Sequence, residues 1–271
     1  MGTALITGAS SGLGTEFAWQ LATAKHNLVL VARSKGRLDK LADALRQIAG
    51  VKVEVLPADL SVAEDRARVV ERLCVGTLEI DDEPTQPGPD EPAPIGLLVN
   101  NAGYGLETAF LDDDVTASKQ ALDVMVTAVM ELSYAAAHQM TSRGRGAIIN
   151  VSSVASYLAG STYSAHKAWV RVFTEALSND LEGTGVVASA VLPGLTRTEF
   201  HERAKIDDSA FPGFSWLSPI TVVAHALDGA RRGQVLVTPS VRYQVATGLL
   251  RLAPRWLVRK LGATGVVATR R

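Results

Sequence analysis

A serine, a tyrosine and a lysine lie close together between residues 150 and 167, and their side chains could together move a proton. Tyr163 and Lys167 are four positions apart, so that in a helix they share one face and the ammonium can lie beneath the phenol. A nearby cation favours the phenolate and lowers a phenol pKa that is ordinarily about 10. Ser153 ends an apolar run and could donate a hydrogen bond to the same substrate oxygen. This stretch is therefore the candidate reaction centre, although an exposed Tyr and Lys on a helix is the commoner origin of such a pattern.

Ser152 is the alternative to Ser153 in this role. We favour Ser153 because it lies at the end of the predicted strand 147–152, where its side chain can face a cleft.

Composition restricts the class of protein. With 271 residues, 47% of them hydrophobic, the chain can bury a substantial core in one domain or two. The single cysteine, Cys74, excludes an intrachain disulfide and is typical of a reducing cytoplasm; without paired thiols or a histidine cluster we predict no metal site. Strand-like sequence from Thr3 leaves no room for a cleavable leader, and charges interrupt the apolar segment 121–140, so we expect a cytoplasmic protein.

Strand-like and helix-like segments alternate along the chain. Apolar runs predict strands at residues 3–7, 27–32, 51–56, 95–100, 147–152, 186–192 and 234–238. Apolar residues at helical spacing lie between them. The alternation predicts a single doubly wound α/β domain, with a parallel sheet of about seven strands and helices on both faces.

The turn after the first predicted strand has the spacing of a nucleotide-binding loop. Its glycines would let backbone amides approach a pyrophosphate at the start of the following helix. The predicted cofactor contacts in this turn are Gly8, Ser10, Ser11, Gly12, Leu13 and Gly14.

Three further strand ends carry candidate cofactor residues. Arg33, after the second strand, offers a cation for a 2′-phosphate and favours NADP, with NAD as the alternative. Asp59 and Leu60 end the third strand and could contact the adenine. Asn101, Ala102 and Gly103 follow the fourth strand, beside the cofactor. Ligands of this architecture bind at the carboxyl ends of the strands.

The chain resembles the short-chain dehydrogenase/reductase family. The motifs occur in family order over nearly all of residues 3–240: Thr7-Gly-x-x-x-Gly-x-Gly14, Asp59, Asn100-Asn-Ala-Gly103, Ser153, Tyr163-x-x-x-Lys167, and Pro193-Gly194 followed by Thr196 and Thr198. The resemblance implies a Rossmann-like fold, a Tyr163 acid/base and a Ser153 that polarises the carbonyl. It implies that Lys167 binds the nicotinamide ribose and lowers the tyrosine pKa, and that Pro193, Gly194, Thr196 and Thr198 lie over the nicotinamide and the phosphates. Relatives are commonly homodimers or homotetramers.

Two departures from the family pattern stand out. Met125 takes the place of an asparagine of the proton relay, and a thioether is a poor substitute for an amide. Only ten positions separate Ser153 from Tyr163, which predicts a tight loop. We expect an NADP(H)-dependent oxidoreductase that interconverts a ketone or aldehyde and an alcohol on an apolar small molecule. The alternative is a catalytically impaired nucleotide-binding sensor or scaffold, because of Met125.

Three segments lie outside the regular alternation. Residues 77–94 hold five prolines and six acidic residues and predict a disordered insertion. Relatives place a mobile lid at 199–216, where Phe200, Phe211, Phe214 and Trp216 line an apolar substrate site or dock the lid on the core. We therefore divide the chain into a domain, 1–240, and a basic amphipathic extension, 241–271.

The extension has apolar residues interleaved with arginines over 243–261. It could lie on a membrane surface, but we favour a role in covering the substrate pocket or in a dimer contact. Tyr104, Tyr157 and Leu195 are further pocket candidates. Nothing in the sequence favours nucleic-acid binding, since the body is acidic and the tail has no recognition module.

Overall fold

The computed structural model describes residues 2–78, 91–105, 110–111, 114–198 and 212–264. Its centre is a seven-stranded parallel sheet in the order β3-β2-β1-β4-β5-β6-β7. The strands are β1 (Thr3–Thr7), β2 (Asn27–Ala32), β3 (Val53–Pro57), β4 (Ile95–Asn100), β5 (Gly146–Val151), β6 (Val186–Val191) and β7 (Leu236–Val237). The predicted sheet is confirmed, with strand bounds shifted by one or two residues.

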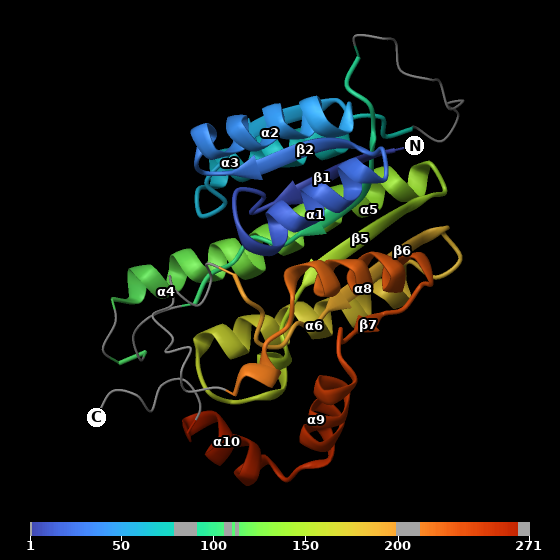
Figure 1. Cartoon of the computed structure of the whole chain (residues 1–271). Helices are drawn as coiled ribbons and strands as arrows, with labels where there is room; N and C mark the ends of the chain where they lie inside the picture. Colours follow the sequence, from blue (N-terminus) through green and yellow to red (C-terminus); the bar gives the residue numbers. More distant parts are fainter. Residues whose placement is uncertain (1, 79–90, 106–109, 112–113, 199–211, 265–271) are drawn as a thin grey trace.

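Helices cover both faces of the sheet (Figure 1). They are α1 (Gly12–Thr23), α2 (Lys35–Ala49), α3 (Ala63–Cys74), α4 (Val115–Leu122), α5 (Ala128–Ser142), α6 (Thr162–Asp180) and α8 (Pro219–Arg231). One core cluster joins the sheet to α1, α2 and α8, and the other joins it to α3, α5 and α6. Successive residues of a strand enter opposite clusters: Leu28 of β2 lies in the first and Val29 in the second. Burial on both faces explains why the strands read as unbroken apolar runs.

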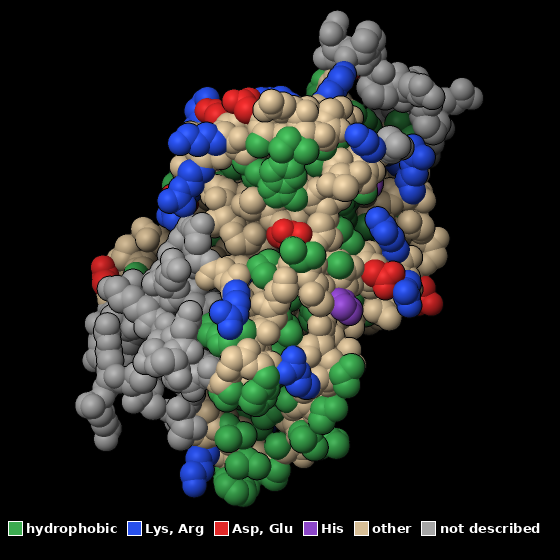
Figure 2. Space-filling view, viewed as in Figure 1, with side chains coloured by type: hydrophobic (Ala, Val, Ile, Leu, Met, Phe, Trp, Pro, Cys, Tyr) green, Lys and Arg blue, Asp and Glu red, His purple; other side chains and the backbone are tan. Residues whose placement is uncertain are grey.

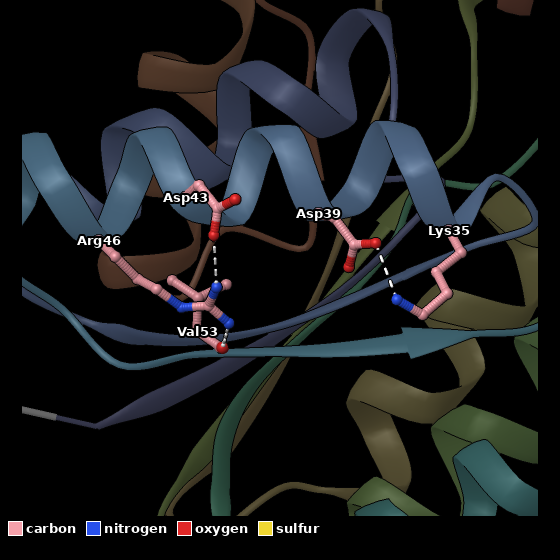
Figure 3. Close-up of polar contacts among 5 residues, drawn as sticks. All are labelled: Lys35, Asp39, Asp43, Arg46 and Val53. Carbon is pink, nitrogen blue, oxygen red and sulfur yellow. Dashed lines mark hydrogen bonds and ion pairs between the residues drawn. The ribbon is translucent and has the colours of Figure 1, made fainter.

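Helix α2 is held over β3 by polar contacts on its outer side (Figure 3). Lys35 Nζ lies 2.8 Å from Asp39 Oδ2, and Arg46 Nη1 lies 2.9 Å from Asp43 Oδ1. Arg46 also donates to the carbonyl of Val53 at the start of β3. The two ion pairs lie within α2 and contribute only about 0.3–0.5 kcal/mol each, so the bond from Arg46 to Val53 is the contact of this group that joins the helix to β3.

The last strand is shorter than predicted. Residues 234–238 were expected to be extended, but β7 contains only Leu236 and Val237. The carbonyl of Thr238 instead accepts hydrogen bonds from the amide of Ser240, at 2.8 Å, and from Gln244 Nε2, at 2.9 Å. These bonds turn the chain out of the sheet and into the next helix.

Two helices follow the sheet, α9 (Val241–Leu252) and α10 (Arg255–Thr264), and they lie at the lower end of the molecule in Figure 1. Most of the proposed insertion, most of the proposed lid and the last seven residues lie outside the described residues. The described end of the lid region forms a short 3₁₀ turn, η4 (Gly213–Ser215). None of the helices in the described ranges has the length and apolar content needed to span a bilayer.

Candidate active site

The turns after β1 and β4 are joined by one buried hydroxyl. Thr7 Oγ1 accepts hydrogen bonds from the amides of Asn101, at 3.0 Å, and Ala102, at 3.1 Å. Asn101 Nδ2 returns a bond to the carbonyl of Thr7 at 2.9 Å and a longer one to that of Gly8 at 3.3 Å. The side chain of Asn101, which we expected at the cofactor, therefore holds the glycine turn in place.

The glycine turn is shaped by close approaches that a side chain would block. Gly8 has φ +65°, and a Cβ there would lie 2.9 Å from both the Ala102 Cα and the Asn101 Nδ2. A Cβ on Gly14 would overlap the carbonyl of Gly8. Helix α1 begins at Gly12, and the amides of its first turn have no partner within the helix. Because the glycines carry no side chains, a ligand can approach these amides closely. Such a turn fits the pyrophosphate of a dinucleotide.

The ends of β2 and β3 hold the other adenosine-side candidates. Arg33 is exposed and makes no ion pair with a residue that the structure describes. Asp59 Oδ1 accepts bonds from the amide of Ser61, at 3.0 Å, and from its hydroxyl, at 2.8 Å, which fixes the turn after β3. The side chain of Leu60 is buried in the core, so only its backbone remains for a cofactor contact. Burial raises the pKa of Tyr104, and the charge of nearby Arg33 opposes this.

A buried polar network ties the centre of the sheet to two helices. Asn100 Nδ2 donates to Asn150 Oδ1 at 2.9 Å and to Ser133 Oγ at 3.1 Å. Asn150 Nδ2 donates in turn to Thr174 Oγ1, in α6, at 3.0 Å. Sequence reasoning missed this network, because its members are far apart in the chain. It anchors the strand that leads to Ser153 and the helix that carries the tyrosine and the lysine.

The two candidate serines have different surroundings. Ser152 is buried and its hydroxyl donates to the carbonyl of Lys167 at 2.7 Å, which secures the start of α6 to β5. Ser153 accepts a bond from the amide of Ala155 at 3.1 Å and makes a side-chain hydrogen bond with Tyr163. The structure thus brings Ser153, and not Ser152, to the phenol.

Lys167 lies beneath the tyrosine ring. Its Nζ is 5.7 Å from the ring centroid of Tyr163 and donates to the carbonyl of Val151 at 2.7 Å. Burial lowers the pKa of Lys167 to about 8. Burial also raises the pKa of Tyr163 to about 12, although the hydrogen bond with Ser153 acts in the opposite direction. The shared helix face is as predicted. The pKa of Tyr163 is raised and not lowered as expected, because burial outweighs the hydrogen bond with Ser153.

Met125 lies at the same place as the lysine. It is fully buried in a π-helical turn, η1 (Asp123–Thr127), between α4 and α5. A Cβ on Gly103 would lie 3.4 Å from the Met125 Sδ and 3.3 Å from the Lys167 Nζ, so both groups flank the turn after β4. Single π turns within helices are frequent at functional sites. The thioether occupies the position beside the lysine where the family resemblance places an amide.

The segment after β6, residues 192–198, passes close to the glycine turn. A Cβ on Gly12 would lie 3.4 Å from the Thr198 Cβ, so these residues face each other. Thr196 is buried, and its hydroxyl donates to the carbonyl of Gly194 at 2.9 Å. Thr198 therefore lies next to the glycine turn, and its contact with the phosphates stays a prediction.

Tyr243, which sequence reasoning missed, anchors the segment after β6 by hydrogen bonds. Its hydroxyl accepts from the amide of Leu195 at 3.1 Å and donates to the carbonyl of Ser215 at 2.9 Å. A Cβ on Gly194 would overlap its ring. The signal in the sequence was Gly194, because a glycine can indicate that another group packs closely against the backbone. It does not indicate which residue packs there.

The C-terminal helices also contact the short loop between Ser153 and Tyr163. A Cβ on Gly160 would lie 2.9 Å from the carbonyl oxygen of Gly262, so α10 meets this loop backbone to backbone. The ring of Tyr157 lies between the guanidinium carbons of Arg171, at 4.6 Å, and Arg251, at 5.8 Å, measured to the ring centroid. The wall of the site is therefore completed by the tail.

Two of the proposed lid aromatics are described, and arginines pack on both. The Arg242 guanidinium carbon lies 5.8 Å from the ring centroid of Phe214, and that of Arg197 lies 5.8 Å from the ring centroid of Trp216. Trp216 is partly buried, whereas Phe214 remains 67% exposed, so the contacts favour docking for Trp216 alone. Phe200 and Phe211 lie outside the described residues.

Comparison with known proteins finds relatives of similar sequence and similar fold. A very-long-chain 3-oxoacyl-CoA reductase of Podospora anserina is 32% identical over 203 residues, which are 72% of this chain but 55% of that protein. The solved short-chain dehydrogenase from Sphingobium yanoikuyae in complex with NADPH is 35% identical, with a TM-score of 0.79 over 93% of this chain and 94% of the other. The bulky-bulky ketone specific alcohol dehydrogenase from Comamonas testosteroni is 32% identical, with a TM-score of 0.75 over 94% and 96%.

The family model described as short chain dehydrogenase matches residues 2–209, which include β1 to β6. The chain belongs to the short-chain dehydrogenase/reductase family of oxidoreductases.

Proposed function

We propose that this chain is an NADP(H)-dependent oxidoreductase that interconverts a ketone or aldehyde and an alcohol on an apolar small molecule. One observation carries the proposal. The phenol of Tyr163 is hydrogen-bonded to Ser153, and its ring lies over the Lys167 ammonium. Both lie at the carboxyl ends of the strands, where the glycine turn also lies. A proton donor, a carbonyl-polarising hydroxyl and a dinucleotide site are the three parts that such a reaction needs.

The strand ends provide the groups that would hold the cofactor. The backbone amides around Gly8, Gly12 and Gly14 would bind the pyrophosphate. Arg33 would bind the 2′-phosphate. Lys167 would bind the nicotinamide ribose. When bound, the nicotinamide supplies or accepts the hydride. The NADPH complex of the Sphingobium relative supports the preference for NADP over NAD.

The other proposed cofactor contacts lie in the turns at the carboxyl ends of the strands or in the helices that follow them. They are Ser10, Ser11, Leu13, Asp59, Leu60, Asn101, Ala102, Gly103, Tyr163, Pro193, Gly194, Thr196 and Thr198.

The described residues indicate how the proton is handled. With a pKa of about 12, the Tyr163 phenol is protonated at neutral pH and is ready to donate to a carbonyl oxygen. Ser153 has a single hydroxyl proton, which it can turn from the phenol to that oxygen once the phenol donates its own proton there. Lys167, with a pKa of about 8, exchanges protons near neutral pH and can return a proton to the Tyr163 phenolate. The phenol is thus in the protonation state that a proton donor to a carbonyl needs.

An apolar substrate is supported by the names of the relatives. One acts on very-long-chain 3-oxoacyl-CoA and another on ketones with two bulky groups. The competing function, a nucleotide-binding sensor or scaffold, is motivated by the buried thioether of Met125 beside Lys167.

The test is NADPH oxidation with a panel of apolar ketones, aldehydes and quinones. Tyr163→Phe is expected to lower turnover by about 10²–10⁴-fold, the usual contribution of a positioned acid. Tyr134→Phe, at an exposed tyrosine of α5, is the matched control and should keep wild-type turnover. Equal rates for wild type and Tyr163→Phe would sink the assigned mechanism. Tight NADPH binding without turnover on any substrate would instead support the sensor.

A further inference from the structure

Helix α9 has two faces of different character. The inner face carries Tyr243, which holds Leu195 and Ser215, and the buried Thr247. The outer face carries apolar side chains at spacings of four, four and three residues, which places them in one row. Their exposed fractions are 72% for Val241, 58% for Val245, 66% for Leu249 and 87% for Leu252.

Trp256, at 62% exposure, continues the row at the start of α10. We call Val241, Val245, Leu249, Leu252 and Trp256 the C-terminal stripe. Figure 2 shows hydrophobic side chains gathered at the lower end of the molecule, where Figure 1 places α9 and α10. A contiguous exposed apolar patch of this kind marks an interaction surface.

The charges around the stripe have one sign. The sequence contains no acidic residue after Asp228. The basic side chains exposed on the same two helices are Arg242, Arg251, Arg255, Arg259 and Lys260. All the charged side chains of α9 and α10 are therefore cations, and an apolar row that carries only cations on its own helices is complementary to a surface that is apolar inside and anionic outside.

We propose that the C-terminal stripe docks on an anionic lipid surface, with its apolar side chains in the interface and the neighbouring arginines at the headgroups. Amphipathic helices bind membranes in this way, and the binding combines apolar burial with attraction to anionic lipid. A second copy of the chain is a poorer occupant. A two-fold contact places the same surface on both sides, so each stripe would bring arginines against arginines.

The stripe adjoins the candidate active site. Helix α10 touches the loop between Ser153 and Tyr163 through Gly262 and Gly160, and α9 touches Gly194 through Tyr243. Docking therefore brings the wall of the site close to the lipid, in which an apolar substrate would be dissolved. This advantage rests on the proposed function, whereas docking itself does not and is measured without substrate or cofactor.

Vesicle flotation of the full chain tests the proposal. We expect binding to vesicles of phosphatidylcholine mixed with phosphatidylglycerol at low salt, at least tenfold weaker binding to phosphatidylcholine alone, and release at high salt. Arg255→Gln/Arg259→Gln should weaken binding about 25-fold, from about fivefold for each charge. Leu249→Ser/Leu252→Ser should weaken it at least tenfold. Because these side chains are exposed, the variants are expected to fold.

Matched controls remove similar side chains elsewhere. Ile48→Ser/Ile220→Ser replaces two apolar residues that are 72% and 62% exposed, and Lys40→Gln/Lys119→Gln removes two exposed cations. Both controls should bind as wild type does. Trp256 is a built-in reporter, since its fluorescence should shift to the blue on anionic vesicles and Trp256→Phe should abolish that shift.

The proposal is overturned by three results. These are no binding to anionic vesicles at low salt, equal weakening in the control and stripe variants, and conversion of an oligomer to monomers by Leu249→Ser/Leu252→Ser in light scattering. The last result would assign the stripe to a contact between copies of this chain.

Discussion

Lys167 makes the stability of this protein depend on pH in a direction that can be measured. Burial lowers the pKa of its ammonium from 10.5 to about 8, a fall that corresponds to about 3 kcal/mol of stability lost while the group stays charged. Below the folded-state pKa both the folded and the unfolded chain hold the proton, so this loss is present in full. As the pH rises from about 8 to about 10.5, the unfolded chain binds more protons than the folded chain, and the free energy of unfolding rises.

Tyr163 sets the upper limit of this rise. Burial raises the pKa of its phenol from 10.0 to about 12, so at higher pH the unfolded chain releases a proton that the folded chain keeps. The free energy of unfolding then falls between about pH 10 and about pH 12. The two residues together predict a maximum near pH 10.

Urea unfolding at several pH values checks the rising limb. Between about pH 7 and about pH 10 the free energy of unfolding of wild type should gain about 2 kcal/mol relative to Lys167→Met, which has no ammonium to titrate. Lys40→Met, in which an exposed lysine of α2 is replaced, is the matched control and should keep the wild-type dependence. Parallel curves for wild type and Lys167→Met would refute the assignment of this pH dependence to the buried ammonium.

Three further predictions concern the site. Arg33→Asp should raise the KM for NADPH by about 10- to 100-fold, from the loss of a charge-assisted hydrogen bond of about 1.5–3 kcal/mol, and should affect NADH far less; similar losses for both cofactors in steady-state kinetics would mean that Arg33 does not read the phosphate. Met125→Asn should raise turnover on a working substrate while lowering stability by about 1–3 kcal/mol, because an amide replaces a fully buried thioether, and unchanged or lower turnover would count against an interrupted relay. Gly194→Ala should lower the free energy of unfolding by about 1–3 kcal/mol, since its Cβ overlaps the Tyr243 ring, and Gly194→Ala/Tyr243→Leu should recover part of the loss in thermal melts.

Strand positions were predictable because each strand is an apolar run that ends at a polar or glycine-containing turn. The run at residues 27–32 and the turn at Gly8 identify β2 and the dinucleotide loop from local sequence alone. The preference for Ser153 over Ser152 also followed from local geometry, because neighbouring residues at a strand end point in opposite directions.

Contacts between distant segments were not predictable in the same way. No local pattern joins Asn150 to Thr174, or Tyr243 to Gly194, since each pair meets only when the chain has folded. The pKa of Tyr163 shows the same limit. The sequence predicts a cation on the same helix face, but the burial that raises the pKa depends on the whole site.

The contact between Gly160 and Gly262 has a consequence for the order in which the protein is built. Synthesis proceeds from the N-terminus, so all seven strands and α6 have been made before α10, which begins at Arg255. The loop that leads to Tyr163 meets its backbone partner only when residue 262 has been made. A nascent chain that stops before α10 would therefore carry a formed sheet and an unsupported catalytic loop.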